Sequence, residues 1–220
     1  MILGYSAAQM RDAEAPLLAA GVPLMQRAAT GLAREVRSLL AGDDAAVLLL
    51  VGSGNNGADA LYAGAILAGA GADVTMVRTG DRVHAEALAS AFAAGTREAP
   101  PTAIGELAAS ADVVVDGILG TGTSANPALR GTARELVAAI LAAGVTTPVV
   151  AVDIPSGIDP DDGSVPDPCV LRATLTVTFG GYKAGLLLAP ASAVAGEVRL
   201  IDIGLGDELA KVEPLLRVER

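Results

Sequence analysis

A short apolar run that ends directly at a glycine-rich turn is the feature that most restricts what this chain can fold into. Residues 46–51 read Ala-Val-Leu-Leu-Leu-Val without a polar side chain, which is typical of a strand buried on both faces of a sheet. The pattern then repeats, with helix-like stretches between the strand candidates, and this alternation predicts right-handed crossovers and a parallel sheet. The further strand candidates are 73–78, 112–116 and 149–153, and the helix-like stretches are 65–69, 85–94 and 129–143.

The two ends of the chain extend this pattern. Before the first strand, apolar residues recur at helical spacing in two segments, with Ser6 and Pro23 as start signals, so two helices are expected there. After the fourth strand, residues 174–179 and 197–203 are further strand candidates. We therefore expect one α/β domain over residues 1–220, with a mostly parallel sheet, helices on both faces and an N-terminal helical extension.

The composition narrows the classes of function. No apolar run reaches the roughly 20 residues that span a bilayer, and the first residues do not resemble a signal peptide, so we expect a cytoplasmic protein without a membrane partner. The net charge of −10 repels phosphate backbones, which argues against a nucleic-acid partner. Cys169 and His84 are the only residues of their types, which excludes an internal disulfide and a Cys/His zinc site.

The first strand candidate is followed by the turn 52–59, Gly-Ser-Gly-Asn-Asn-Gly-Ala-Asp. In an open parallel sheet, ligands bind at the carboxyl ends of the strands. Glycines at such a turn let the backbone approach a phosphate, and the following helix N-terminus supplies amide donors; a turn that only reverses the chain is the alternative. Ala58 and Asp59 stand where a Walker A loop has Lys and Ser or Thr, which argues against a P-loop enzyme.

The second and third turns each begin with a carboxylate at the end of an apolar strand. Asp116 precedes a Gly-Thr-Gly segment, and Asp153 precedes Ile-Pro-Ser-Gly. A carboxylate at the end of a buried strand is costly unless it is paired, hydrogen-bonded or used in function, so Asp153 is the best acid/base candidate. Asp116 as a helix cap or turn former is the alternative.

Oxygen-bearing side chains on these turns are candidates for a cation site. Asn56, Asp116 and Ser156 lie on separate strand-end turns that could converge, and such ligands suit an alkali or alkaline-earth cation rather than zinc. On the fourth turn, Lys183 stands among glycines and could meet an anion, although a solvated lysine is an alternative.

Three motifs, in this order, resemble the YjeF N-terminal-domain family, the NAD(P)H-hydrate epimerases: residues 54–59, 116–122 and 152–159. The resemblance implies a Rossmann-like three-layer sandwich and epimerisation of hydrated NADH and NADPH, so that a partner dehydratase can repair both epimers. It also implies a homodimer. The dehydratase domain of the family's bifunctional members is expected to be absent after Arg220. Further segments that look like the family are Met10, Asp12, 24–29, 176–179, Lys183 and 196–204.

The resemblance also assigns roles to residues. It implies that Asp153 contacts the hydrate and is catalytic, and that Asn56, Asp116 and Ser156 bind a potassium ion. The predicted substrate-binding residues are Asn55, Asn56, Gly57, Ala58, Asp59, Gly120, Thr121, Gly122, Thr123, Ser124, Ala125, Asn126, Asp153 and Lys183.

The chain departs from the family pattern at Ala58 and Ala60, where the family has glycine, and at Gln26 and Ala29, where it has glutamate and glycine. Added methyl groups at a close-approach turn could restrict the ligand. Two other functions are weighed against epimerisation. A non-catalytic binding module should have lost Asn56, Asp116 or Asp153, and all three are present in this sequence. An NADP-dependent dehydrogenase would use Arg78, which stands where an NAD enzyme has a carboxylate.

Overall fold

The sheet predicted from the sequence is present as seven parallel strands. The computed structural model describes residues 1–122 and 126–219. The strand order is β4-β3-β2-β5-β6-β7-β9, and every neighbouring pair runs parallel. The bounds are β2 Ala46–Val51, β3 Asp73–Arg78, β4 Arg97–Glu98, β5 Val113–Gly117, β6 Val149–Val152, β7 Leu175–Phe179 and β9 Glu197–Ile201.

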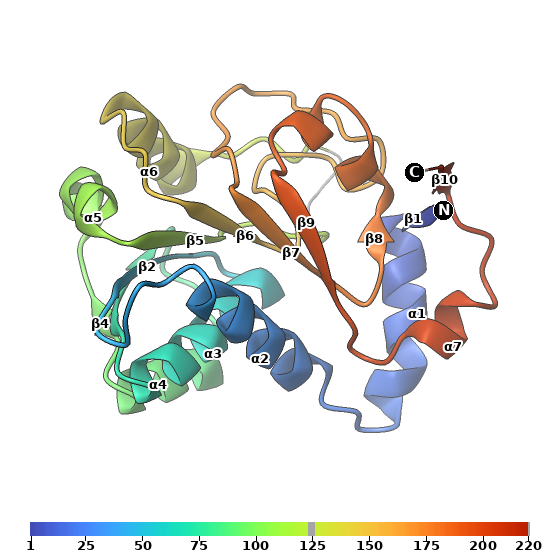
Figure 1. Ribbon diagram of the computed structural model, residues 1–220, viewed down its shortest axis with the longest axis horizontal. Helices are drawn as coiled ribbons and strands as arrows, with labels where there is room; N and C mark the ends of the chain where they lie inside the picture. Colours follow the sequence, from blue (N-terminus) through green and yellow to red (C-terminus); the bar gives the residue numbers. More distant parts are fainter. Residues whose placement is uncertain (123–125, 220) are drawn as a thin grey trace.

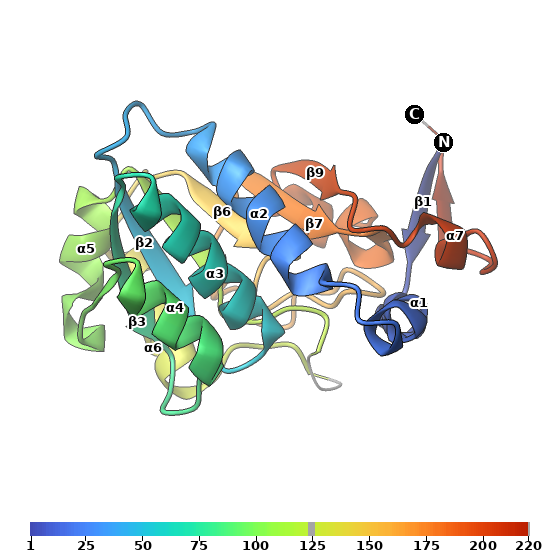
Figure 2. The ribbon, with the colours of Figure 1, turned by 90° about the horizontal axis from the view of Figure 1, so that it is seen from below.

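Helices cover both faces of this sheet, which confirms the expected α/β three-layer class (Figures 1 and 2). One face carries α2 Leu24–Arg37, α3 Asn55–Gly69 and α4 Ala85–Ala93, and the other carries α5 Ile104–Ser110 and α6 Gly131–Ala142. Successive residues of β2 belong to the two different cores: Leu49 packs on the first face and Leu48 on the second. This alternation follows from the two-residue period of a strand.

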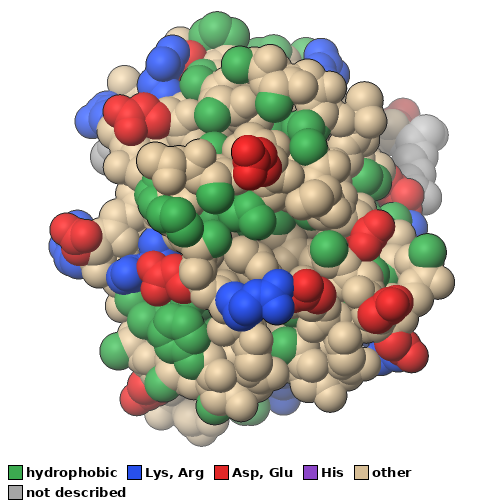
Figure 3. All heavy atoms as spheres, turned by 90° about the vertical axis from the view of Figure 1, so that its left-hand side faces the viewer, with side chains coloured by type: hydrophobic (Ala, Val, Ile, Leu, Met, Phe, Trp, Pro, Cys, Tyr) green, Lys and Arg blue, Asp and Glu red, His purple; other side chains and the backbone are tan. Residues whose placement is uncertain are grey.

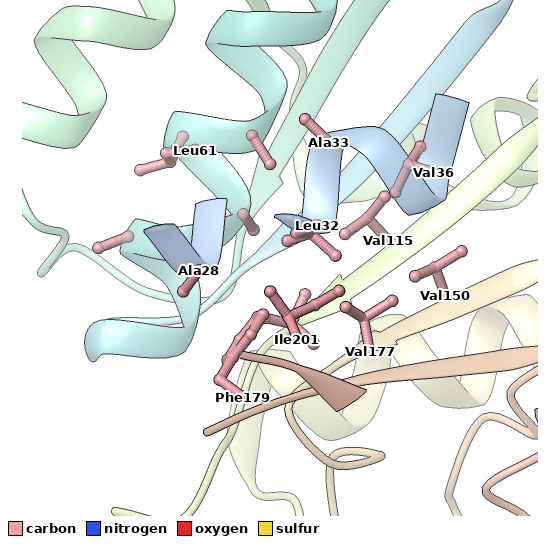
Figure 4. Packing of buried hydrophobic residues seen from close by; sticks show 14 of the residues in the cluster. Ala28, Leu32, Ala33, Val36, Leu61, Val115, Val150, Val177, Phe179 and Ile201 are labelled. Atoms are coloured by element: carbon pink, nitrogen blue, oxygen red, sulfur yellow. The ribbon is translucent and has the colours of Figure 1, made fainter. Parts of the chain in front are cut away.

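The core beneath α2 fixes that helix over the later strands. Figure 4 shows Leu32 and Val36 of α2 pointing toward Val115, Val150 and Val177, which come from three neighbouring strands. Full burial of such aliphatic side chains contributes about 1.5–3 kcal/mol each. Helix α2 is therefore held over β5, β6 and β7 by apolar side-chain contacts.

A second, three-stranded sheet stands apart from the main one. Strand β1 Ile2–Tyr5 pairs antiparallel with β10 Leu216–Val218 and parallel with β8 Tyr182–Lys183. Helix α1 Ala7–Ala19 follows β1 directly, with Ser6 and Gln9 forming a capping box, and packs beside α7 Gly206–Leu209. Figures 1 and 2 show α1 and α7 at the end of the molecule away from α5.

The structure corrects several predicted boundaries. Strand β5 is shifted by one residue from 112–116, and α6 is shorter than the predicted 129–143. Both predicted N-terminal helices are present. The sequence interpretation missed β1, β4, β8, β10, α5 and α7, together with three 3₁₀ turns, because short segments lack a readable period. Those turns are Pro101–Ala103, Ala184–Leu187 and Ala191–Ala193. No helix in the described residues combines the length and hydropathy that crossing a membrane requires.

Candidate functional site

A pocket of about 340 Å³ lies where the main sheet and the N-terminal helices meet. The carboxyl ends of the central strands share one edge of the sheet, since Val51 is in register with Gly117 and Val152 with Val177. The turns that follow these strands therefore meet at the pocket. The predicted site residues that line it are Asn55, Asn56, Asp59, Gly120, Thr121, Gly122, Asp153 and Lys183.

The glycine-rich turn packs against the second turn rather than standing open along its whole length. A Cβ atom on Gly52 would lie 1.9 Å from the carbonyl oxygen of Ile118, and one on Gly57 would lie 2.1 Å from the carbonyl oxygen of Gly52. By contrast, nothing lies within 4 Å of a Cβ on Gly54. Gly52 thus lets the first and second turns touch, and Gly57 lets the start of α3 pack on Gly52, while Gly54 and the N-terminus of α3 face the pocket.

Ala58 and Ala60 are fully buried and belong to the hydrophobic core beneath α2. The structure places Ala58 and Gly57 in the first turns of α3, behind the pocket wall. Neither Ala58 nor Ala60 is among the described residues that line the pocket, and the effect of their methyl groups on the ligand stays a prediction. Asn126 is exposed and accepts a hydrogen bond from the amide of Ala128, and it is not among the described residues that line the pocket. Thr123, Ser124 and Ala125 lie outside the described residues.

Asp153 follows β6 directly and has a left-handed backbone, with φ of 67°. Such a conformation in a non-glycine residue costs roughly 1–2 kcal/mol and persists where surrounding contacts impose it. Its amide donates to Val177 O, 2.8 Å away. Its Oδ1 accepts hydrogen bonds from Thr178 Oγ1 at 3.2 Å and the Phe179 amide at 3.3 Å. The backbone and one carboxylate oxygen are thus fixed on β7.

Lys183 forms a buried ion pair with the same oxygen of Asp153. Its ammonium group also donates to Thr178 Oγ1 at 3.1 Å and to Phe179 O at 2.9 Å, so all three of its N–H donors are used. The described residues donate no hydrogen bond to Asp153 Oδ2, and Asp153 lines the pocket. The arrangement anchors one carboxylate oxygen and leaves the other for a ligand.

Asn56, Asp116 and Ser156 do converge, as the sequence predicted. Asn56 Nδ2 donates to the carbonyl oxygens of Leu119 and Val152, at 2.9 and 2.8 Å. Ser156 donates to Asp116 twice, through its amide at 2.9 Å and its hydroxyl at 2.6 Å. A Cβ on Gly120 would lie 2.7 Å from Asn56 Oδ1, so the glycine leaves room for this amide.

Asp116 is a buried carboxyl group whose described partners are all neutral. It is 1% exposed, and its hydrogen bonds come from Ser156 and the Ile118 amide. Burial raises the pKa of Asp116, and the hydrogen bonds from Ser156 oppose that shift in part. A buried carboxylate without a cationic neighbour is costly. The oxygen atoms of Asp116, Ser156 and Asn56 are hard ligands, which suit an alkali or alkaline-earth cation.

Helices α1 and α2 supply pocket residues that the sequence interpretation missed. Arg11 and Glu14 from α1 line the pocket beside the predicted residues. Their spacing of three residues shows that they share one helix face, but no local signal places that face against the glycine turns. The other lining residues that the sequence interpretation missed are Leu18, Leu24, Met25, Ala28, Ile118, Leu119, Phe179 and Ile203, whereas Ser53 and Gly54 belong to the predicted turn 52–59.

Arg78 does not reach this pocket. Its guanidinium Nε lies 2.7 Å from Glu98 Oε1, and the pair bridges β3 and β4. Figure 3 shows acidic and basic side chains interspersed, without a basic patch, on the face that is seen from the left-hand side of Figure 1. An NADP-binding role for Arg78 would require this ion pair to open, so the structure does not favour the dehydrogenase interpretation.

Comparisons with known proteins find one family and one fold. Residues 21–185 match the family described as YjeF-related protein N-terminus. A Clavibacter michiganensis protein named NAD(P)H-hydrate epimerase is 51% identical over 99% of this chain and 96% of its own length. A Mycobacterium tuberculosis protein named bifunctional NAD(P)H-hydrate repair enzyme Nnr is 44% identical over 91% of this chain and 41% of its own length. The crystal structure of yeast ynu0 is similar in fold, with a TM-score of 0.74 at 18% identity, covering 91% of this chain and 87% of that one.

Proposed function

Because this chain belongs to the YjeF-related N-terminal family, we infer that it is an NAD(P)H-hydrate epimerase, an isomerase that interconverts the R and S epimers of hydrated NADH and NADPH. The observation that carries this conclusion within the site is Asp153. One of its oxygens is anchored to Lys183 and β7, and the other receives no hydrogen bond from the described residues of the pocket. A fixed carboxylate of this kind is suited to moving a proton at a bound substrate.

The reaction requires bond breaking at one ring carbon. The two epimers differ at the carbon that carries the added hydroxyl group, so a bond to that carbon must break and re-form on the opposite face. A proton moves at each stage, and a positioned carboxylate contributes about 10²- to 10⁴-fold to such a step. We propose that Asp153 performs this general acid/base role, while Asn55, Asn56, Asp59 and the 120–122 turn hold the hydrate.

The direct test supplies the purified protein with an unequal mixture of the two hydrate epimers. Chromatography should show rapid approach to the equilibrium ratio, far above the rate without protein. A folded protein that leaves the ratio unchanged would contradict the proposed function and favour a non-catalytic binding module.

Arg11 is the proposed contact for the anionic part of the nucleotide. Among the described pocket residues it is the one cation without a salt bridge, because Lys183 is paired with Asp153. Its Nη1 lies 3.4 Å from Thr121 O, beside the glycine turns. We expect Arg11→Ala to weaken hydrate binding about 10-fold, which corresponds to the loss of one charge-assisted contact.

The test of Arg11→Ala measures KM and kcat separately, at low and at high salt concentration. The loss should appear in KM and shrink as salt rises, because salt screens an exposed charge. Arg82→Ala removes an exposed arginine outside the pocket and should leave KM unchanged. Equal KM values for the Arg11→Ala and wild-type proteins would exclude the proposed contact.

We propose that Asn56, Asp116 and Ser156 bind a potassium ion. The support is the buried Asp116 carboxyl group with neutral partners and the oxygen-rich turns around it. Bound potassium would supply charge balance for Asp116 and hold the second and third turns together.

Potassium should raise the free energy of unfolding relative to an equal concentration of choline. The increase is about 2.7 kcal/mol when the ion is present at 100 times its Kd. Thermal melts in the two salts measure the difference. Asp116→Asn should abolish the potassium effect while leaving the general salt effect, and a variant that still responds would exclude this site.

Several relatives are named bifunctional repair enzymes, which supports a functional partnership. We propose that an NAD(P)H-hydrate dehydratase, separate or fused, consumes the epimer that this domain supplies. The homodimer and the cytoplasmic location expected from the sequence stay predictions.

A further inference from the structure

Asp59 is a buried carboxyl group on the pocket wall with an unpartnered oxygen. It lies in the second turn of α3 and is 8% exposed. No hydrogen-bond donor in the described part of the chain reaches its Oδ1. Buried polar atoms are nearly always hydrogen-bonded, so an orphaned one requires an explanation. Asp59 lines the pocket, and a buried carboxyl group whose Oδ1 receives no hydrogen bond is less costly when it carries a proton.

Lys183 is not available to neutralise Asp59. Its three N–H donors go to the Asp153 carboxylate, Thr178 Oγ1 and Phe179 O. Arg11, the other cation on the wall, is exposed and lies against Thr121 O. Asp59 therefore has no direct cationic partner among the described residues.

Three carboxyl groups share this pocket with that single buried lysine. The negative charges of Asp153 and Glu14 both disfavour ionisation of Asp59, and the positive charge of Lys183 offsets this effect only in part. Burial first, then Asp153 and Glu14, raises the pKa of Asp59 well above its usual range. Burial also raises the pKa of Glu14, which Lys183 and Arg11 oppose. Like-charged carboxylates in one desolvated site resist ionising together.

We propose that Asp59 is the proton-donating catalytic residue of the epimerisation and that Asp153 is its proton-accepting partner. This role rests on the epimerase function proposed above. Asp59 reaches the pocket from α3 and Asp153 from the end of β6, so the two groups approach a bound ring from different elements. Pairs of carboxyl groups whose environments differ in this way divide acid and base roles in other enzymes.

The proposed reaction begins at the hydroxyl group of the hydrate. Asp59 gives its proton to the hydroxyl oxygen of the hydrate, the carbon–oxygen bond breaks with both electrons on oxygen, and water leaves. The lone pair of the adjacent ring nitrogen forms a double bond to that carbon. Water then adds to the opposite face, the double-bond electrons return to nitrogen, and the surplus proton goes to the free oxygen of Asp153. A pocket water returns that proton to Asp59, so no other reagent is consumed.

Asp59→Asn tests the proposal, because it keeps the shape and neutrality of a protonated aspartate but cannot give up an acidic proton. We expect kcat to fall about 100-fold, with hydrate binding retained. Asp59→Glu keeps the acid and should recover part of the rate. Asp44→Asn, which changes an exposed loop residue, is the matched control and should keep the wild-type rate.

The free energy of unfolding, measured against pH, tests whether Asp59 carries a proton in the folded protein. An ionised Asp59 that only contacts the ligand would not give the pH dependence expected here. Because the folded-state pKa of Asp59 is raised, the native protein binds more protons than the unfolded chain between the two pKa values. The contribution of Asp59 to wild-type stability therefore falls as pH rises through that window. The Asp59→Asn protein lacks this contribution, so its stability relative to wild type should increase with pH.

Infrared spectra give a direct view of the proton. At neutral pH the wild-type spectrum should contain a protonated-carboxyl band that the Asp59→Asn spectrum lacks. Absence of that difference, or an Asp59→Asn protein with wild-type kcat, would overturn the role of Asp59 while leaving the epimerase function standing. A wild-type protein that fails to interconvert the epimers would overturn the proposed function and this role with it.

Discussion

Replacing Asp153 by Asn is expected to lower kcat/KM for hydrate epimerisation by about 10²- to 10⁴-fold, the usual contribution of a positioned general acid/base. The amide keeps the size of the side chain but can neither accept a proton at the former Oδ2 position nor balance Lys183. The loss should therefore lie in kcat rather than in KM. Interconversion of the epimers, followed by chromatography at several substrate concentrations, separates the two parameters.

The same substitution has a structural cost that must be separated from the chemistry. Lys183 is 2% exposed, and removal of its partner leaves a buried charge unpaired, which costs about 3–5 kcal/mol. The double variant Asp153→Asn with Lys183→Met removes both charges and should recover much of that stability without recovering activity. A double variant that regains the wild-type rate would exclude Asp153 as the acid/base residue. Asp207→Asn on the exposed start of α7 is the neutral control.

Replacing Gly52 by Ala should have the largest effect on the fold. The new Cβ would lie 1.9 Å from the carbonyl oxygen of Ile118 and 2.7 Å from its carbonyl carbon. Both atoms belong to the backbone, so no side-chain rotation relieves the contact, and the first and second turns must move apart. We expect a loss of about 3 kcal/mol in the free energy of unfolding, at the upper end of overpacking effects, together with loss of hydrate binding.

Urea titration measures the change in unfolding free energy for Gly52→Ala, and a second glycine provides the control. Gly69 ends α3, and nothing lies within 4 Å of a Cβ built on it. Gly69→Ala should stabilise the protein by about 0.5–1 kcal/mol, because alanine favours the helix. If Gly52→Ala and Gly69→Ala behave alike, close backbone contact is not the reason for glycine at position 52.

The sequence identified the strand-end residues well because the signals are local. The apolar run 46–51 and the Asp116 and Asp153 turns each identify a buried strand and its end. Parallel strands in neighbouring register then place those turns along one edge. The convergence of Asn56, Asp116 and Ser156 follows from this arrangement without knowledge of any side-chain contact.

The sequence did not reveal that Asp59 is the orphaned carboxyl group of the pocket. Its burial and the full use of Lys183 by Asp153 depend on residues far from it along the chain. The desolvation that raises a pKa is set by all the atoms packed around a group. A motif can place Asp59 beside the ligand, but its protonation state is a property of the assembled site.

The sequence by itself determined the alternating strands and helices, the glycine turn 52–59 and the carboxylates at the strand ends, because periodicity and turn chemistry act within a few residues. Only the tertiary structure decided that β1 pairs with β8 and β10 from the far end of the chain. That pairing brings α1, with Arg11 and Glu14, to the pocket. Strands of two to four residues carry almost no periodic signal, and their partners are chosen by non-local packing, which no short stretch of sequence encodes.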